Sequence, residues 1–100
     1  METTNRKLLT IVSEAALEET LVRDIEALGA RGYTITDARG KGSHGKRDAT
    51  WTVDANIRIE VLCDVSTAHV IGAALRERYY ANYSMVMYLS EVEVLRPEKF

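Results

Sequence analysis

The sequence predicts an α+β domain in which two helices pack on one antiparallel sheet. Two segments carry apolar residues at helical spacing, residues 51–63 alternate between apolar and polar side chains, and three shorter segments are rich in β-branched residues. Of the 100 residues, 46% are apolar and 28% are charged. We therefore expect one soluble globular domain that spans residues 1–100.

The first half of the chain is expected to form a strand, a helix and a second strand. Lys7–Val12 is apolar on both faces, which is typical of a central strand. Ser13 can then cap a helix. The apolar stripe of that helix consists of Leu17, Leu21, Ile25 and Leu28. Gly29 is expected to end the helix, and Tyr33–Ala38 to form the next strand.

The second half is expected to form a strand, a helix and a final strand. Odd-numbered residues from 51 to 63 are all apolar, which predicts a long strand with one buried face. Asp64 or Ser66 can cap a helix that reaches about Tyr80. Its inner stripe consists of Ala68, Ile71, Leu75 and Tyr79. Met85–Leu95 is then the last strand.

This order of elements is the ferredoxin-like βαββαβ pattern, a four-stranded antiparallel sheet with two helices on one face. The other face of the sheet would be open in a monomer. Either Leu9 and Ile11 or Leu8 and Val12 of the first strand must lie there. An exposed apolar sheet face usually indicates an oligomer.

Composition excludes several classes of protein. The formal net charge of −2 provides no general basic field for nucleic-acid binding. Cys63 is the only cysteine, so no intrachain disulfide can form, which fits a reducing compartment. The N-terminal segment lacks the pattern of a signal peptide, and no apolar run reaches transmembrane length. We therefore expect a cytoplasmic protein.

The segment ARGKGSHGKRDAT, residues 38–50, combines glycines with basic side chains. Gly40, Gly45 and Lys46 match the start of a Walker A pattern. However, Arg47 stands where Ser or Thr would bind Mg²⁺, and the loop leads into a strand instead of a helix, which excludes that interpretation. From composition alone, an anion-binding loop and a solvated hairpin tip remain equal alternatives.

Elsewhere the sequence predicts no catalytic residues and no metal site. RNA-recognition modules share the strand order, but the polar face of residues 51–63 offers no aromatic platform for bases. The segment VSEAAL lacks the glycine-rich anion cradle of acylphosphatases. His44 and His69 are too isolated for a triad or a metal site, and Cys63 is expected in the core. We therefore predict that the protein is not an enzyme.

Three segments taken in order, GARGYTITDARGKGSHGKR, DANIRIEVLCD and YYANYSMVMYLSEVEVL, resemble the PII-like signalling proteins. The similarity is greatest to the branch associated with bicarbonate transporters and carboxysomes, and it covers nearly the whole chain. The resemblance implies a homotrimer of ferredoxin-like subunits whose sheets face the three-fold axis. It also identifies residues 40–54, approximately, as the T-loop.

In that family an adenine nucleotide binds between neighbouring subunits, and some relatives also bind bicarbonate beside it. The resemblance implies that residues 41–43 and Arg47 contact phosphate, that two polar residues of the third strand line the cleft, and that backbone amides of residues 83–85 approach the nucleotide. The implied nucleotide-binding residues are Thr36, Lys41, Gly42, Ser43, Arg47, Asn56, Glu60, Tyr83, Ser84 and Met85.

The chain departs from classical PII proteins after the second helix. There it reads ANYSM, without the lysine and glycine of the classical phosphate loop, which favours AMP, ADP or cyclic AMP over ATP. The resemblance implies a sensor with no tightly bound cofactor, which regulates a membrane bicarbonate or other anion transporter through its T-loop and can be recruited to the membrane by it. A slow nucleotide phosphohydrolase and a structural trimer of the divalent-cation-tolerance type are the alternatives.

Overall fold

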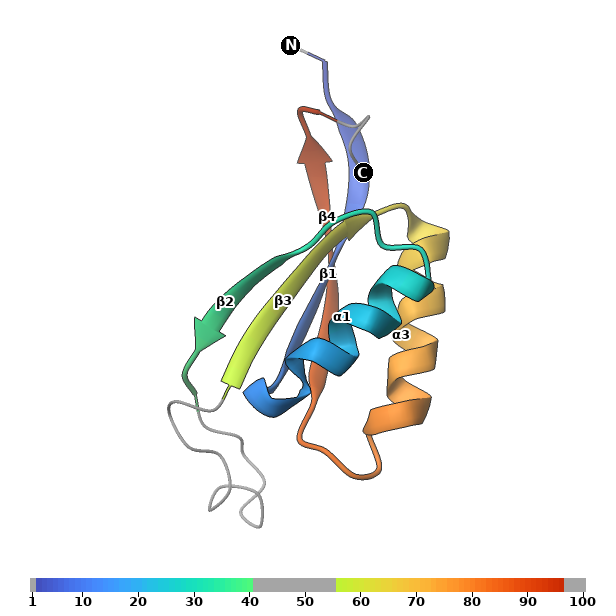
Figure 1. Ribbon diagram of the computed structural model, residues 1–100. Helices are drawn as coiled ribbons and strands as arrows, with labels where there is room; N and C mark the ends of the chain where they lie inside the picture. Colours follow the sequence, from blue (N-terminus) through green and yellow to red (C-terminus); the bar gives the residue numbers. More distant parts are fainter. Residues whose placement is uncertain (1, 41–55, 97–100) are drawn as a thin grey trace.

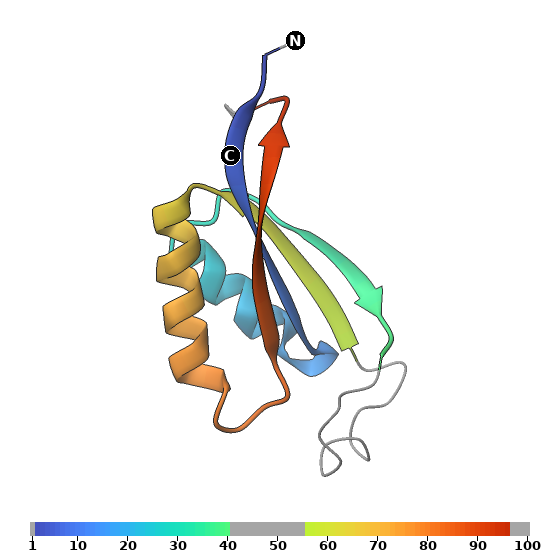
Figure 2. The same cartoon turned by 180° about the vertical axis from the view of Figure 1, so that it is seen from behind.

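The computed structural model describes residues 2–40 and 56–96 and confirms the predicted order of elements (Figure 1). The elements are β1 (Thr4–Glu14), the 3₁₀ helix η1 (Ala15–Leu17), α1 (Glu18–Ala27), β2 (Thr34–Ala38), β3 (Asn56–Cys63), α3 (Val65–Tyr79) and β4 (Val86–Val94). The strands form one antiparallel sheet in the order β2-β3-β1-β4. Figure 2 shows α1 and α3 on the same face of this sheet, as the ferredoxin-like pattern requires.

The central strand is β1, and it is longer than the sequence predicted. Residues 7–14 pair with β3, and residues 4–12 pair with β4. The prediction stopped at the apolar segment Lys7–Val12 because the flanking residues are polar. Each polar end pairs with one neighbouring strand, residues 4–6 with β4 and residues 13–14 with β3, so partner strands and not side-chain hydrophobicity set the ends of β1.

The prediction that Ser13 caps the first helix is wrong. Ser13 remains in β1, where it is buried, and its hydroxyl donates a hydrogen bond of 3.0 Å to the carbonyl oxygen of Glu14. The ladder between β1 and β3 continues through this position, so the chain enters α1 only after η1. Leu17 occupies the N-cap without a side-chain hydrogen bond, and Glu18 and Glu19 place negative charge near the positive end of the helix.

Gly29 ends α1, as predicted. Its φ angle of 112° lies in the left-handed region, which glycine adopts without steric cost. The Gly29 N–H donates to the carbonyl oxygen of Glu26 at 3.2 Å, and the Ala30 N–H donates to that of Ile25 at 2.9 Å. This pair of hydrogen bonds is the Schellman arrangement, and it directs the chain towards β2.

Asp64, one of the two predicted caps, begins α3. Its Oδ1 accepts hydrogen bonds from the Thr67 N–H at 2.8 Å and from the Ser66 hydroxyl at 3.1 Å. The hydrogen bonds from Thr67, and then the one from Ser66, hold the pKa of Asp64 below its usual value. In the described part of the chain, no helix has the length and apolar character needed to cross a membrane.

The core lies between the sheet and the two helices and contains the residues that periodicity predicted. Odd-numbered residues from 57 to 63 of β3 are buried, whereas the predicted start of this strand at residues 51–55 lies outside the described residues. The largest fully buried apolar side chains are Leu9, Ile11, Leu21, Ile25, Ile59, Val61, Ile71 and Leu75. Leu9 and Ile11 therefore face the helices, which decides between the two alternatives left by the sequence.

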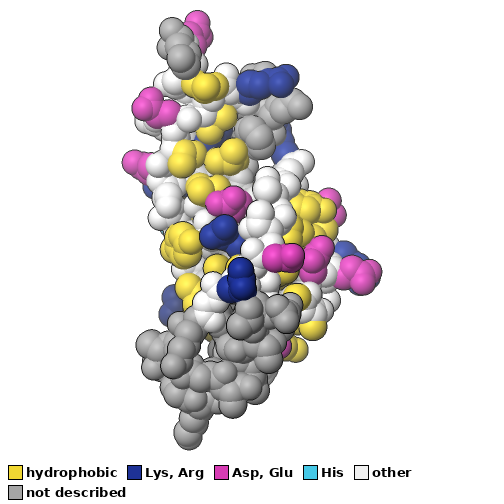
Figure 3. Space-filling model, turned by 90° about the vertical axis from the view of Figure 1, so that its left-hand side faces the viewer, with side chains coloured by type: hydrophobic (Ala, Val, Ile, Leu, Met, Phe, Trp, Pro, Cys, Tyr) yellow, Lys and Arg dark blue, Asp and Glu magenta, His cyan; other side chains and the backbone are white. Residues whose placement is uncertain are grey.

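The opposite face of the sheet carries the other row of β1, which includes Leu8 and Val12, and both are half-buried. The neighbouring strand β4 adds Val86 and Tyr88, which are 51% and 49% exposed. Figure 3 views the molecule from the sheet side, where yellow apolar side chains lie among charged ones. We call this surface the open face.

Candidate functional site

One end of the sheet gathers the segments that the resemblance implies in nucleotide binding. There β2 ends at Ala38, β3 begins at Asn56, and the connection from α3 to β4, residues 80–85, returns to the same end (Figure 1). The register explains this arrangement, because Asn56 lies opposite both Glu14 and Ala38 and β4 starts beside the same end of β1. Three separate segments therefore meet at this end.

The predicted polar residues of the sheet lie on the open face but at different depths. Thr36 is exposed and lies opposite Arg58, whereas Asn56 is 3% exposed. Glu60 is half-buried and lies four residues from Asn56, which corresponds to about 13 Å along β3. The structure thus brings Thr36 and Asn56 close to the end of the sheet and leaves Glu60 farther along the face.

The connection between α3 and β4 holds the predicted residues Tyr83, Ser84 and Met85. Tyr83 and Ser84 are half-buried, and Met85 is buried against the core. The Tyr83 N–H donates to the carbonyl oxygen of Tyr79 at 2.9 Å, and the two rings form an edge-to-face contact with centroids 5.8 Å apart. The last turn of α3 therefore determines the path of this connection.

The predicted loop-base residues Lys41, Gly42 and Ser43, together with Arg47, lie outside the described residues. Of the predicted T-loop, the structure describes Gly40 alone. The assignment of phosphate contacts to these side chains stays a prediction.

A polar contact that sequence reasoning missed lies behind the connection. The Tyr79 hydroxyl donates a hydrogen bond of 2.5 Å to Oδ2 of Asp24 in α1, and Arg78 Nη1 lies 3.2 Å from Oδ1 of the same carboxylate. Burial, and then the hydrogen bond with Asp24, raises the pKa of Tyr79 to about 12. In the sequence, Asp24 lies between the stripe residues Leu21 and Ile25. This position beside the buried stripe was the feature that could have indicated a partly buried carboxylate.

Of the residues considered for catalysis or metal binding, the structure describes Cys63 and His69. Burial, and then the charge of Asp64, raises the pKa of the Cys63 thiol, so it is protonated at neutral pH and unsuited to nucleophilic attack. His69 is exposed on α3. Within residues 2–40 and 56–96 there is no group of three or more His, Cys, Asp and Glu side chains that could hold a metal ion.

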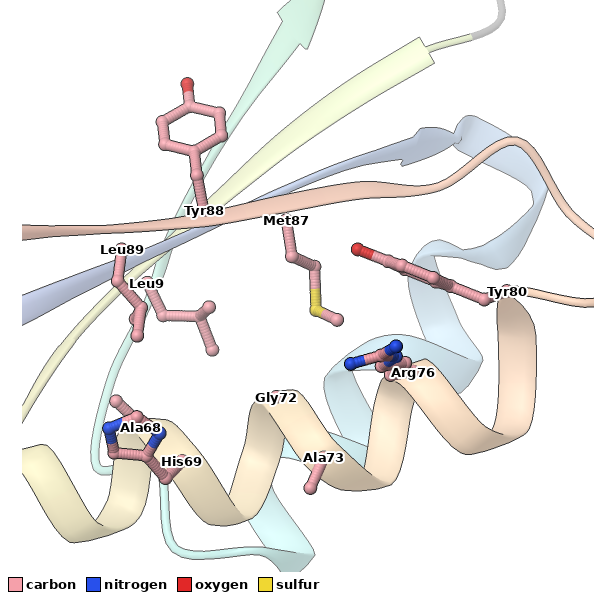
Figure 4. A pocket seen from close by; sticks show the side chains of 10 residues that line it. All are labelled: Leu9, Ala68, His69, Gly72, Ala73, Arg76, Tyr80, Met87, Tyr88 and Leu89. Atoms are coloured by element: carbon pink, nitrogen blue, oxygen red, sulfur yellow. The ribbon is translucent and has the colours of Figure 1, made fainter.

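A cleft of about 410 Å³ lies between α3 and the edge strand β4 (Figure 4). Its floor is apolar, and His69, Arg76 and the Tyr80 hydroxyl lie at its margins. In the middle of α3, a Cβ added to Gly72 would meet no atom within 4 Å. The cleft is lined by Leu9, Ala68, His69, Gly72, Ala73, Arg76, Tyr80, Met87, Tyr88 and Leu89, none of which is among the predicted nucleotide-binding residues.

Comparison with solved structures gives full-length matches. A PII-like signalling protein from Thermus thermophilus is 43% identical, and the match covers 100% of this chain and 99% of that chain with a TM-score of 0.84. CPII from Thiomonas intermedia, bound to ADP, AMP and acetate, is 26% identical, with 100% and 98% covered and a TM-score of 0.85. CPII bound to ADP and bicarbonate is 28% identical, with 99% and 97% covered and a TM-score of 0.83.

The family model described as "Nitrogen regulatory protein P-II" matches residues 6–99, which includes every strand and helix of the described structure except the first two residues of β1. The strand order, the two helices on one face and the 43% identity agree with this match. The protein therefore belongs to the PII family of regulatory proteins.

Proposed function

We propose that this protein is a sensor that binds an adenine nucleotide, with bicarbonate as a second effector. The observation that carries the proposal is the full-length similarity to CPII, whose structures contain ADP, AMP and bicarbonate. The meeting of β2, β3 and the α3–β4 connection at one end of the sheet supports it, because a nucleotide needs contacts from several segments at once.

In this proposal the nucleotide lies between two subunits of a homotrimer. The open face supports an assembly, because Val86 and Tyr88 expose apolar area that a neighbouring sheet would cover. Lys41, Gly42, Ser43 and Arg47 would contact phosphate, while the backbone amides of residues 83–85 would approach the nucleotide. Thr36, Asn56 and Glu60 would line the cleft from the open face, where they are placed at different distances from the end of the sheet.

The α3–β4 connection favours small nucleotides. Residues 80–85 contain no lysine, arginine or glycine, so this segment offers neither a cation nor the closest backbone approach to a triphosphate. We therefore expect AMP, ADP or cyclic AMP to bind more tightly than ATP.

The regulatory output belongs to the same proposal. Ligand binding at the loop base would change the conformation of the T-loop, and the T-loop would then dock on or release a membrane bicarbonate or other anion transporter. The population of a docking conformation shifts only if the ligand contacts one conformation better than the other. The association with the carboxysome and transporter branch of PII-like proteins is part of this proposal.

Calorimetric titration tests the proposal directly. The protein would be titrated with AMP, ADP, ATP and cyclic AMP, each with and without bicarbonate. Lys41→Ala should weaken the binding of the preferred phosphate-containing ligand by roughly tenfold, the size expected for one charge-assisted contact. Arg23→Ala is the matched control, because Arg23 lies on the outer surface of α1, where it pairs with Glu19.

The same preparation distinguishes the alternatives. No binding of any of the four nucleotides at millimolar concentration would overturn the proposal. Release of inorganic phosphate that Lys41→Ala abolishes would support the slow phosphohydrolase instead. Binding of a divalent cation without binding of any nucleotide would favour the structural trimer of the divalent-cation-tolerance type.

A further inference from the structure

Tyr79 makes several contacts with the α3–β4 connection. The carbonyl oxygen of Tyr79 accepts hydrogen bonds from the Asn82 N–H at 3.1 Å and from the Tyr83 N–H at 2.9 Å. Its ring also meets the Tyr83 ring at an interplanar angle of 60°. The segment contains no glycine and no lysine, so the position of its backbone amides is important for any ligand that binds beside it.

Tyr79 is in turn hydrogen-bonded to Asp24 of α1, which lies 55 residues earlier in the chain. Its ring is buried in the core with Ile71 and Leu75, and its hydroxyl donates to the carboxylate of Asp24. Asp24 is largely covered, and its other oxygen pairs with Arg78. The Tyr79 hydroxyl donates to a carboxylate that has a second partner, so this contact helps to orient the Tyr79 side chain.

We propose that Asp24 and Tyr79 form a latch that positions residues 82–85 for ligand binding. This inference rests on the proposed function, because it concerns the same nucleotide site. Neither residue needs to touch the ligand; both are positioning residues that act through the connection. When the latch is broken, the connection samples other conformations, and the apparent affinity falls in proportion to the fraction that remains competent.

The substitution Tyr79→Phe isolates the latch from the core. It keeps the buried ring and its edge-to-face contact with Tyr83, and it leaves the Tyr79 carbonyl oxygen in place. Asp24 keeps its ion pair with Arg78, so no buried charge is left without a partner. Tyr80→Phe is the matched control, because Tyr80 is the next residue and its side chain is exposed.

The experiment combines amide hydrogen exchange with nucleotide titration on the full-length protein. In Tyr79→Phe, the amides of Asn82 and Tyr83 should exchange faster while those of β1 and β3 are unchanged, and the dissociation constant for ADP should rise by roughly fivefold, the effect of one hydrogen bond. Tyr80→Phe should change neither measurement. Adding Asp24→Ala to Tyr79→Phe also removes the ion pair with Arg78, but it should weaken ADP binding no further, since the hydrogen bond to Tyr79 is already absent.

Each outcome has a clear meaning. If the wild-type protein binds ADP and Tyr79→Phe binds it equally well, the latch is refuted while the proposed function stands. Faster exchange throughout the sheet would assign Tyr79 a general structural role and also refute the latch. If the wild-type protein binds no nucleotide, the proposed function fails, and unchanged exchange at residues 82 and 83 in Tyr79→Phe would refute the latch separately.

Discussion

The two faces of the sheet are made by the same four strands, yet among the described residues helices cover one face and leave the other open. On the helix face, Ile11, Ile59 and Val61 are fully buried. On the open face, Val86 and Tyr88 remain about half exposed although they lie beside the central strand. The difference shows which surface folding satisfies by itself, and it identifies the surface on which an assembly would depend.

The largest expected effect comes from a substitution that leaves a cavity on the helix face of the sheet. Ile59→Ala should destabilise the protein by about 2–5 kcal/mol, because it removes buried methylene groups and leaves a cavity among well-packed neighbours. Urea unfolding at a fixed protein concentration measures this loss. Val70→Ala is the control, since Val70 is exposed on α3 and should change the free energy of unfolding by less than about 0.5 kcal/mol. Equal effects of the two substitutions would contradict the described core.

The next largest effect is expected from a charge introduced on the open face. Val86→Asp should prevent assembly, because a trimer would bury the new carboxylate against apolar side chains of a neighbour. Val70→Asp is matched in chemistry and in exposure, with Val70 at 52% and Val86 at 51%. Light scattering after size exclusion should give a monomer mass for Val86→Asp and a trimer mass for Val70→Asp and the wild type. If both variants keep the wild-type mass, the open face is not the assembly surface.

The smallest expected effect concerns the two helices that cover the sheet. The N-terminus of α3 has a side-chain cap, whereas that of α1 has none. The pKa of Asp64 is lower in the folded protein than its usual value of 3.8, so the charged carboxylate stabilises the fold above that pH. The contribution is lost as the pH falls through the folded pKa. Asp64→Ala should therefore lower Tm at about pH 7, and the difference from the wild type should shrink towards about pH 3. A difference that is independent of pH would show that the charge of Asp64 does not contribute.

Much of the fold could be predicted from the chain. The alternation in residues 57–63, the stripe from Ala68 to Tyr79 and the stop at Gly29 each depend on local geometry, and the structure confirms them. The resemblance also identified the PII family, which the family model and the full-length matches confirm. The site residues were harder to predict from the sequence, because the position of each one depends on contacts between distant segments.

The errors have a common physical origin. Ser13 has a side chain typical of an N-cap. However, the β1–β3 ladder extends through Ser13, so this residue stays in the strand and does not cap the helix. The ends of β1 were likewise set by β3 and β4. The contact between Asp24 and Tyr79 joins two helices that the sequence treats separately, so no local pattern could pair them.

By itself the sequence determined the order of the four strands and two α-helices that the structure describes, because these elements depend on periodicity and turn chemistry within short segments. The tertiary structure decided which row of β1 faces the helices, where β1 ends, and that Asp24 of α1 meets Tyr79 of α3. These features depend on hydrogen bonds and packing between segments far apart in the chain. The physical reason is that side-chain spacing determines the secondary structure of a segment, whereas the identity of the segments it packs against depends on contacts that exist only in the folded chain.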